Sequence, residues 1–177
     1  MGHRFKSDKR LSTEPGIFLS EIIVGVGDLQ LSNREDTVIT TFALGSCIGV
    51  TLWDPVKKVG GMLHAMLPDS KIHGKTTEKR AMFVDTGMQD FFEKLRQMGG
   101  NPQSCQCKLF GGAQVMQADS FFKIGTRNVT AFLALAEQSR IPVLCNETGG
   151  QYNRTIKIRL SDGLVAVKTP NQEVFVR

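Results

Sequence analysis

Apolar residues occur in short runs that favour β-strands over most of the chain. Two of these runs, Ile48–Trp53 and Val59–Leu67, are apolar on both faces, which predicts strands in the middle of a covered sheet. The segment Asp54–Lys58 between them has the composition of a turn, and Pro55 suits a turn corner. We therefore expect the two strands to form a hairpin.

Further strands are expected on both sides of this hairpin. They are predicted at Glu21–Val26, Val38–Phe42, Cys105–Phe110, Val143–Glu147, Thr155–Leu160 and Leu164–Lys168. The last two flank Ser161-Asp162-Gly163, and in the first of them Ile156, Ile158 and Leu160 alternate with the charged Lys157 and Arg159. This alternation is typical of an antiparallel hairpin that has one face in solvent.

Two segments have helical periodicity. Over about Glu78–Met98, apolar residues recur at spacings of three and four and form one stripe, and Gly99-Gly100 ends the pattern. A second helix is expected over about Arg127–Ser139. Strands outnumber helices, and the chain contains neither a repeat nor a linker. The pattern therefore predicts one α+β domain, residues 21–177, behind a flexible N-terminal tail, residues 1–20.

Composition and charge exclude several classes of protein. A chain of 177 residues with 41% hydrophobic and 22% charged residues is typical of a globular domain, not of a disordered or fibrous one. The net charge is +5, but the first ten residues hold four basic side chains and one acidic one. The remainder is close to neutral, so the sequence does not favour nucleic-acid binding.

The sequence predicts neither membrane insertion nor a cofactor. The longest uncharged run, Thr37–Trp53, is shorter than the ~20 apolar residues that a membrane-spanning helix needs. The glycine-rich segments match no nucleotide-binding motif. The four cysteines form no CxxC pair and, together with the histidines, lack metal-ligand spacing. We expect reduced thiols in a cytoplasmic protein without a metal.

A thiol and an imidazole lie in the two strands of the predicted hairpin. A five-residue turn would place Cys47 opposite Ala65, and a four-residue turn would place it opposite His64. A bulge at Gly60-Gly61 could shift the register by one residue. In each case Cys47 and His64 are direct or diagonal neighbours. An imidazole beside a thiol can take its proton, release the nucleophilic thiolate and later protonate a leaving group.

Small residues and hydroxyl groups surround this pair in the sequence. Gly45 and Ser46 form a tight turn directly before Cys47, which brings backbone N–H groups close to the sulfur. Thr40 and Thr41 on the preceding strand are both candidates to orient the imidazole. The residue types also fit simple packing, because a buried cysteine usually acts as a small hydrophobic side chain. Packing is the expected role of the other three cysteines.

The glycine turn after the strand Cys105–Phe110 is a further candidate part of the site. Gly111 and Gly112 are expected to form a tight turn or to let the backbone approach the cleft that holds Cys47. We therefore include both glycines among the candidate contacts for a substrate or an oxyanion, together with Gly45 and Ser46.

Five segments together carry a resemblance to a known family. They are Thr41-Phe-Ala-Leu-Gly-Ser-Cys47, Gly60-Gly-Met-Leu-His64-Ala-Met-Leu-Pro68, Phe110-Gly-Gly-Ala113, Ile124-Gly-Thr-Arg-Asn128 and Thr148-Gly-Gly150. Over about residues 21–169 the chain resembles the chemoreceptor glutamine deamidase family, CheD. The resemblance implies a layered sandwich of β-sheet and helices, similar to the catalytic domain of deamidating toxins.

The resemblance also implies an activity. Members of this family hydrolyse particular glutamine side chains of bacterial chemoreceptors to glutamate. Cys47 matches the family nucleophile, His64 the general base and acid, and Thr41 the residue that orients the histidine. The implied partners are the cytoplasmic region of a chemoreceptor and a chemotaxis phosphatase of the CheC type.

Two other functions remain open at this point. The chain could be a regulatory module that binds a chemotaxis phosphatase or a receptor with little catalysis. It could also be a cysteine hydrolase that acts on receptor methyl esters, in which case methanol and not ammonia would be released.

Overall fold

The computed structural model describes residues 20–73, 78–114 and 123–176, which form ten strands and two α-helices. The strands are β1 (Ser20–Val24), β2 (Asp28–Ser32), β3 (Thr37–Leu44), β4 (Ile48–Asp54), β5 (Val59–Ala65), β6 (Gln106–Gly111), β7 (Val143–Thr148), β8 (Arg154–Arg159), β9 (Val165–Lys168) and β10 (Glu173–Val176). The helices are α1 (Val84–Gln97) and α3 (Ile124–Gln138), with short 3-10 helices at Ser70–His73, Arg80–Met82 and Pro102–Ser104.

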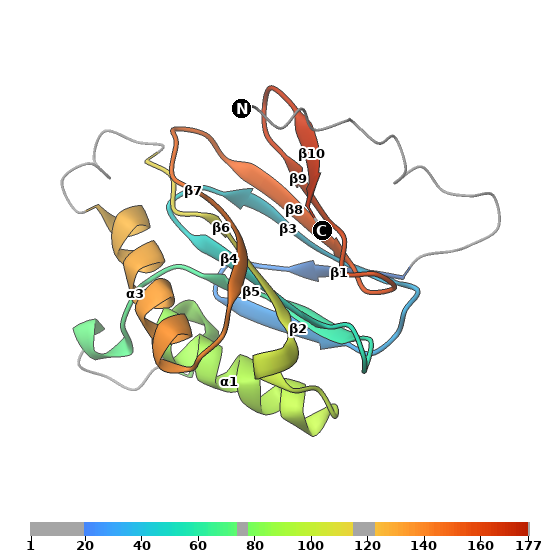
Figure 1. Cartoon of the computed structure of the whole chain (residues 1–177). Coiled ribbons are helices and arrows are strands. Elements are labelled where there is room, and N and C mark those ends of the chain that lie inside the picture. The colour runs from blue at the N-terminus through green and yellow to red at the C-terminus, as the bar shows by residue number, and fades with distance from the viewer. Residues whose placement is uncertain (1–19, 74–77, 115–122, 177) are drawn as a thin grey trace.

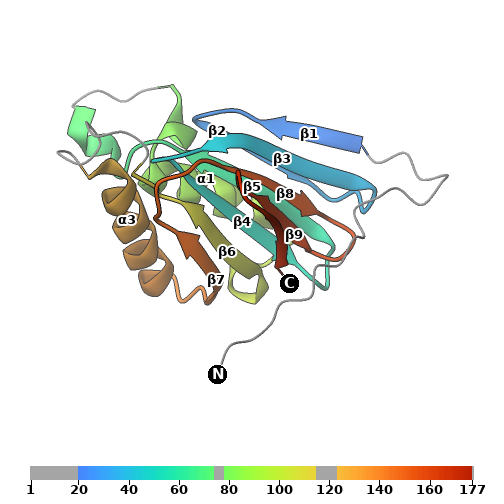
Figure 2. The ribbon, with the colours of Figure 1, turned by 90° about the horizontal axis from the view of Figure 1, so that it is seen from above.

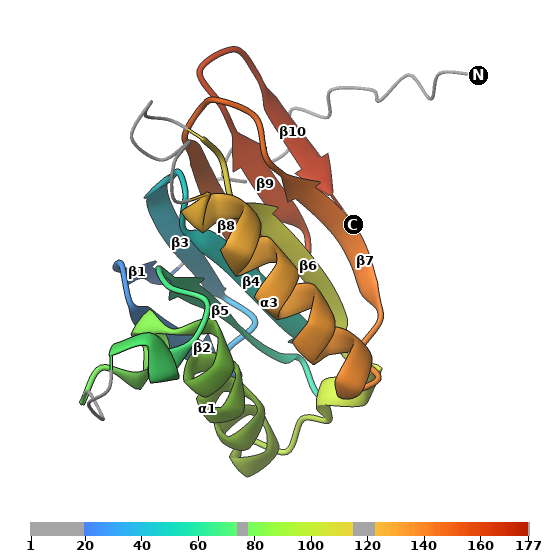
Figure 3. The same cartoon turned by 90° about the vertical axis from the view of Figure 1, so that its left-hand side faces the viewer.

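The elements form three layers (Figure 1; Figure 2). One sheet, with the strand order β2-β5-β4-β6-β7, lies in the middle and is called the helix-covered sheet. Both helices pack on its outer face (Figure 3). The second sheet, with the order β1-β3-β8-β9-β10, covers its inner face and is called the open sheet. The predicted α+β layered sandwich is confirmed.

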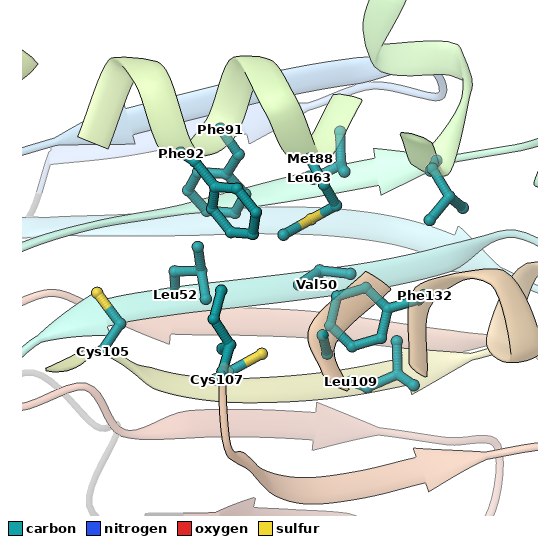
Figure 4. Packing of buried hydrophobic residues seen from close by; sticks show 14 of the residues in the cluster. Val50, Leu52, Leu63, Met88, Phe91, Phe92, Cys105, Cys107, Leu109 and Phe132 are labelled. Atoms are coloured by element: carbon teal, nitrogen blue, oxygen red, sulfur yellow. The ribbon is translucent and has the colours of Figure 1, made fainter. Parts of the chain in front are cut away.

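The helices and the helix-covered sheet share one apolar core (Figure 4). Met88 and Phe91 of α1 and Phe132 of α3 point toward Leu63 and Leu109 of the sheet, and all five side chains are buried. The predicted apolar stripe of the first helix is therefore the face that it buries. Each fully buried side chain of this size contributes roughly 2–3 kcal/mol to stability.

A second core lies between the two sheets. Trp53, Met62 and Phe110 of the helix-covered sheet meet Ile39 and Ile156 of the open sheet. As a result, β4 and β5 are buried along their whole length, as the sequence predicts for a doubly covered hairpin.

Several element boundaries differ from the prediction. The strands β2 and β10 were not expected, and both are short segments at the edges of their sheets, stabilised by pairing with β5 and β9. The first helix begins at Val84 and not near residue 78, because Arg80–Met82 forms a separate 3-10 turn. The second begins at Ile124, three residues earlier than expected. The predicted tail lies outside the described residues except for Ser20.

The β4–β5 hairpin has neither of the two registers that the turn length suggested. Asp54 belongs to β4 and pairs with Val59, and the ladder runs without a shift through Gly60-Gly61. The Asp54 carboxylate accepts hydrogen bonds from the backbone N–H groups of Val56 and Lys57. These bonds close a turn of four residues, Pro55–Lys58, and leave Asp54 in the strand, whereas the four-residue turn expected from the sequence counted Asp54 in the loop. The ladder is therefore shifted, and Cys47 faces neither Ala65 nor His64 directly.

The lengths of the helices in this fold also bear on membrane insertion. None of the helices within the described ranges is long and apolar enough to span a bilayer.

Candidate active site

The candidate residues come together at the end of the β4–β5 hairpin. His64 pairs with Gly49 in the ladder, and Cys47 lies two residues before Gly49, so the thiol and the imidazole are diagonal neighbours. Thr41 of the open sheet reaches His64 across the gap between the sheets, with 2.7 Å between its Oγ1 and the ring Nδ1. Both side chains are buried, whereas Cys47 is half-buried.

The hydrogen bonds of Thr41 fix the tautomer of His64. The Thr41 hydroxyl donates to the Val24 carbonyl at 2.8 Å, and a hydroxyl has only one proton to donate. It therefore accepts a hydrogen bond from the protonated Nδ1 of His64. In the neutral ring this leaves the lone pair on Nε2, and Nε2 is buried with no hydrogen-bond partner among the described residues.

Burial keeps His64 in its neutral form. Removal from water lowers the pKa of His64 from its ordinary 6.5 to about 4, because the charged imidazolium loses its solvation. At neutral pH the ring therefore presents an unprotonated Nε2, which is the form that a general base requires.

The structure distinguishes the two threonines that the sequence left open. Successive strand residues point to opposite faces, so Thr40 points away from His64. The Thr40 hydroxyl instead donates to the Glu21 carboxylate at 2.7 Å, and this bond lowers the pKa of Glu21. Thr41 is the one that contacts the imidazole.

A β-bulge brings the chain from β3 to Cys47. The pairing of β3 with β8 shifts between Thr41 and Leu44, and Ala43 has a left-handed backbone with φ of 54°. Leu44 then turns inward and packs against Gly49 and Gly111, where a Cβ atom would collide with it. This contact anchors the start of the turn that contains the thiol.

Hydrogen bonds hold all three carbonyl groups of the turn before β4, two from backbone N–H groups and one from a side chain. The Gly45 carbonyl accepts from the N–H of Ala113, and the Cys47 carbonyl accepts from the N–H of Gly112, both at 2.8 Å. The Ser46 carbonyl accepts from the side-chain amide of Asn128 on α3 at 3.0 Å. In a trans peptide the N–H points opposite to the preceding carbonyl. The N–H of Ser46 is therefore directed away from Ala113, and the N–H of Cys47 away from Asn128.

The predicted glycine turn lies directly against Cys47. Gly111 and Gly112 have φ values of 93° and 61°, which other residues rarely adopt, and a Cβ at Gly111 would collide with the Cys47 carbonyl oxygen. The Gly112 N–H is committed to that same carbonyl. These two glycines thus position the cysteine backbone, and a contact with substrate stays a prediction.

Asn128 is a residue of this region to which the sequence analysis gave no role. It is fully buried on α3, and its Nδ2 donates to the carbonyl groups of Ser46 at 3.0 Å and Met66 at 2.9 Å. A signal for it exists in the sequence. Asn128 falls on the helical stripe of Gly125, Phe132 and Ala136, where a polar residue must find buried partners.

The other cysteines behave as packing residues, as predicted. Burial raises the pKa of Cys105 and of Cys107 to about 12, and it also raises the pKa of Cys145, so all three stay protonated. All four cysteines are thiols and not disulfides. Within the described ranges, no group of three or more His, Cys, Asp or Glu residues is placed to hold a metal ion.

The lowered pKa of His64 predicts a loss of stability in acid. The unfolded chain binds a proton near pH 6.5 and the folded chain only near pH 4, so protonation favours unfolding between these values. The contribution is complete above pH 6.5 and decreases as the pH falls toward 4. Between pH 7 and pH 5 the wild type should lose about 2 kcal/mol of unfolding free energy through His64.

Urea unfolding of wild type and His64→Asn at both pH values measures this contribution. The variant retains every other titrating group, so the difference between the two pH dependences isolates His64. Equal pH dependences in the two proteins would show that His64 is not held neutral by burial.

Comparisons with known proteins agree with the resemblance seen in the sequence. A family model described as CheD chemotactic sensory transduction matches residues 66–169. The "Probable chemoreceptor glutamine deamidase CheD 1" of Syntrophus aciditrophicus (strain SB) is 36% identical over 154 residues, which are 85% of this chain and 95% of that protein. The "Probable chemoreceptor glutamine deamidase CheD" of Pyrococcus abyssi (strain GE5 / Orsay) is 40% identical, with shares of 84% and 91%.

A solved structure, the hypothetical protein YfiH of Bacillus licheniformis, overlaps with a TM-score of 0.42 and 12% identity, covering 75% of this chain and 59% of that one. A likeness at this level carries no inference. The family model and the relatives do support an inference, because the model matches more than half of the chain and the relatives extend over most of it. The chain belongs to the CheD family of chemotactic sensory transduction proteins.

Proposed function

We propose that this protein hydrolyses glutamine side chains of chemoreceptors to glutamate, with Cys47 as the nucleophile. The names of its relatives supply the substrate class. The observation that carries the chemistry is the Thr41–His64 hydrogen bond, because it leaves a basic Nε2 on a neutral ring whose diagonal neighbour in the hairpin is a half-buried thiol.

The reaction divides into two steps. His64 Nε2 takes the proton of the Cys47 thiol, and the sulfur attacks the carboxamide carbon of the glutamine. The imidazolium then returns the proton to the departing nitrogen, ammonia leaves, and a thioester remains. In the second step His64 deprotonates a water molecule that attacks the thioester, and glutamate and the thiol are released.

Backbone N–H groups at Ser46 and Cys47 are the candidate donors to the oxyanion of each step. The carbonyls that precede them are held by α3 and by Ala113, so the directions of these two N–H groups are set before substrate arrives. One well-placed donor contributes about 3 kcal/mol to transition-state stabilisation. Gly112 is excluded from this role because its N–H already donates to the Cys47 carbonyl.

A direct test is peptide mass analysis of a receptor cytoplasmic fragment before and after incubation with the protein. We expect particular glutamines to become glutamates, with one ammonia released for each. Release of methanol from a methylated fragment, with glutamines unchanged, would instead favour the ester hydrolase. Binding of the fragment with neither product would favour a regulatory module. Binding of a CheC-type phosphatase is an expectation from the resemblance alone, and a cytoplasmic location is an expectation from the reduced cysteines.

The role of Thr41 predicts a smaller effect than loss of the cysteine or histidine. In Thr41→Val the side chain keeps its shape but loses the oxygen that accepts from Nδ1, so the imidazole is free to adopt the other tautomer. We expect deamidation to be slower by roughly 100-fold, the typical effect of misplaced catalytic geometry. The initial rate of ammonia release measures this.

Thr40→Val is the matched control for Thr41→Val. It removes a buried hydroxyl of the same strand, and this hydroxyl bonds Glu21 and not His64. Its rate should stay within about twofold of the wild type, since its hydroxyl does not contact the site. If the two variants were equally slow, Thr41 would have no specific part in orienting the histidine.

A further inference from the structure

Asn128 stands out on the buried face of α3. This face consists of Gly125, Asn128, Phe132 and Ala136, and among these only Asn128 has a polar side chain. Its Oδ1 is buried without a hydrogen-bond partner in the described part of the chain. An unsatisfied buried acceptor is unfavourable. Any advantage of this asparagine must therefore lie in the two hydrogen bonds that its Nδ2 donates.

Those two bonds join the segments that carry the thiol and the imidazole. Ser46 directly precedes Cys47, and Met66 follows His64 by two residues. The last ladder pair of β4 and β5 is Ile48 with Ala65, so Ser46 and Met66 lie just beyond the paired strands. Beyond this end of the ladder, the Asn128 amide bridges the two segments through their carbonyl groups.

The start of α3 also presses on the glycine turn that holds Cys47. A Cβ at Gly125 would lie only 2.5 Å from the Gly112 carbonyl oxygen. Gly112 in turn donates its N–H to the Cys47 carbonyl at 2.8 Å. The helix therefore holds the cysteine turn at two points. Asn128 bonds the Ser46 carbonyl directly, and Gly125 packs against Gly112, which bonds the Cys47 carbonyl.

We propose that Asn128 is a positioning residue, whose side-chain amide fixes the Cys47 thiol and the Cys47 N–H relative to His64. The inference rests on the proposed function, because only a reaction at Cys47 needs that geometry. Holding the Ser46 carbonyl fixes the direction of the Cys47 N–H, since both belong to one planar peptide. Holding the Met66 carbonyl fixes the end of the strand that carries His64.

The chemistry of the two partners specifies an amide donor. Both are carbonyl oxygens, so the side chain between them must supply two protons from one atom. The NH₂ group of asparagine does this, whereas a carboxylate of the same shape has none to give. Replacement by alanine leaves both carbonyls without this donor, and the two segments lose their common anchor.

Alkylation of Cys47 by iodoacetamide tests the proposal without any receptor. The reagent is small and uncharged, and peptide mass analysis reports modification of Cys47 separately from the other cysteines. We expect Asn128→Ala to slow alkylation of Cys47 by about 10-fold at neutral pH, because the sulfur is no longer held near Nε2. With a receptor fragment, kcat should fall roughly 100-fold while KM changes less than about twofold.

Phe132→Leu is the matched control, because it weakens the same buried face of α3 one turn later without touching Ser46 or Met66. Its alkylation rate and its kcat should stay within about twofold of the wild type, even if its unfolding temperature falls as much as that of Asn128→Ala. If Asn128→Ala does not fold, Asn128→Ser keeps one donor and should give an intermediate rate.

A measurement on the unchanged protein completes the test. In the wild type, NMR hydrogen exchange of the Asn128 side-chain amide should be at least about 100-fold slower than that of the exposed Asn146 amide. Fast exchange of the Asn128 amide would overturn the proposal. Alkylation of Cys47 at the wild-type rate or faster in both Asn128→Ala and Asn128→Ser would also overturn it. Slower alkylation in a protein that never deamidates a receptor would support the positioning role and reject the proposed function.

Discussion

Replacement of Cys47 by alanine should abolish the conversion of receptor glutamine to glutamate. Removal of a nucleophile leaves only the contributions of binding and of the oxyanion donors, so we expect the rate to fall by roughly 10⁴-fold or more. Peptide mass analysis of the receptor fragment measures the glutamate formed. Because Cys47 is half-buried and lies at the end of a hairpin, the smaller side chain should leave the fold intact.

Cys145→Ala is the matched control for this variant. Cys145 is also half-buried and also packs against the core between the sheets, but it lies on β7 and outside the candidate site. Its activity should equal that of the wild type. Release of ammonia from the receptor by Cys47→Ala at the wild-type rate would exclude Cys47 as the nucleophile, whatever the family relationship.

Replacement of His64 by asparagine should lower the rate by about 10³–10⁴-fold, the effect of losing a general acid and base. The asparagine amide can still donate a hydrogen bond to Thr41 near the former Nδ1 position, but it places no basic atom at the position of Nε2. The variant thus separates the proton transfer from the packing. We expect its rate to depend little on pH, while the wild-type rate falls as His64 is protonated in acid.

Met62→Leu provides the comparison for His64→Asn. Met62 lies two residues earlier on the same face of β5 and is fully buried in the core between the sheets. This exchange of similar volume should cost less than about 1.5 kcal/mol of stability and leave the rate unchanged. Retention of more than one-tenth of the wild-type activity by His64→Asn would mean that another group carries the proton.

The hairpin illustrates where prediction from the sequence succeeds and where it stops. The apolar runs Ile48–Trp53 and Val59–Leu67 identify two doubly covered strands, because burial on both faces requires apolar residues at every position. Their register depends on one residue at the turn. Asp54 bonds the N–H groups of Val56 and Lys57 and closes a shorter turn than the composition suggested. The composition of the turn, with Pro55 and two lysines, does not reveal whether Asp54 belongs to the strand or to the turn.

The hydrogen-bond partner of His64 in the candidate site shows the same limit at longer range. Alternation along β3 separates Thr40 from Thr41, but only the packing of one sheet on the other determines which face meets His64. The short edge strands β2 and β10 were missed for a related reason. Their own residues give a weak signal, and each is stabilised by pairing with a neighbour.

By itself, the sequence determined the α+β class, the doubly buried hairpin, the packing role of three cysteines and the pairing of a thiol with an imidazole. These properties follow from residue types and short periods, which act over a few neighbouring positions. Only the tertiary structure decided the tautomer of His64, the choice of Thr41 and the buried amide of Asn128 between two strand ends. Each of these depends on atoms that are far apart in the chain and meet only when the sheets and α3 pack together.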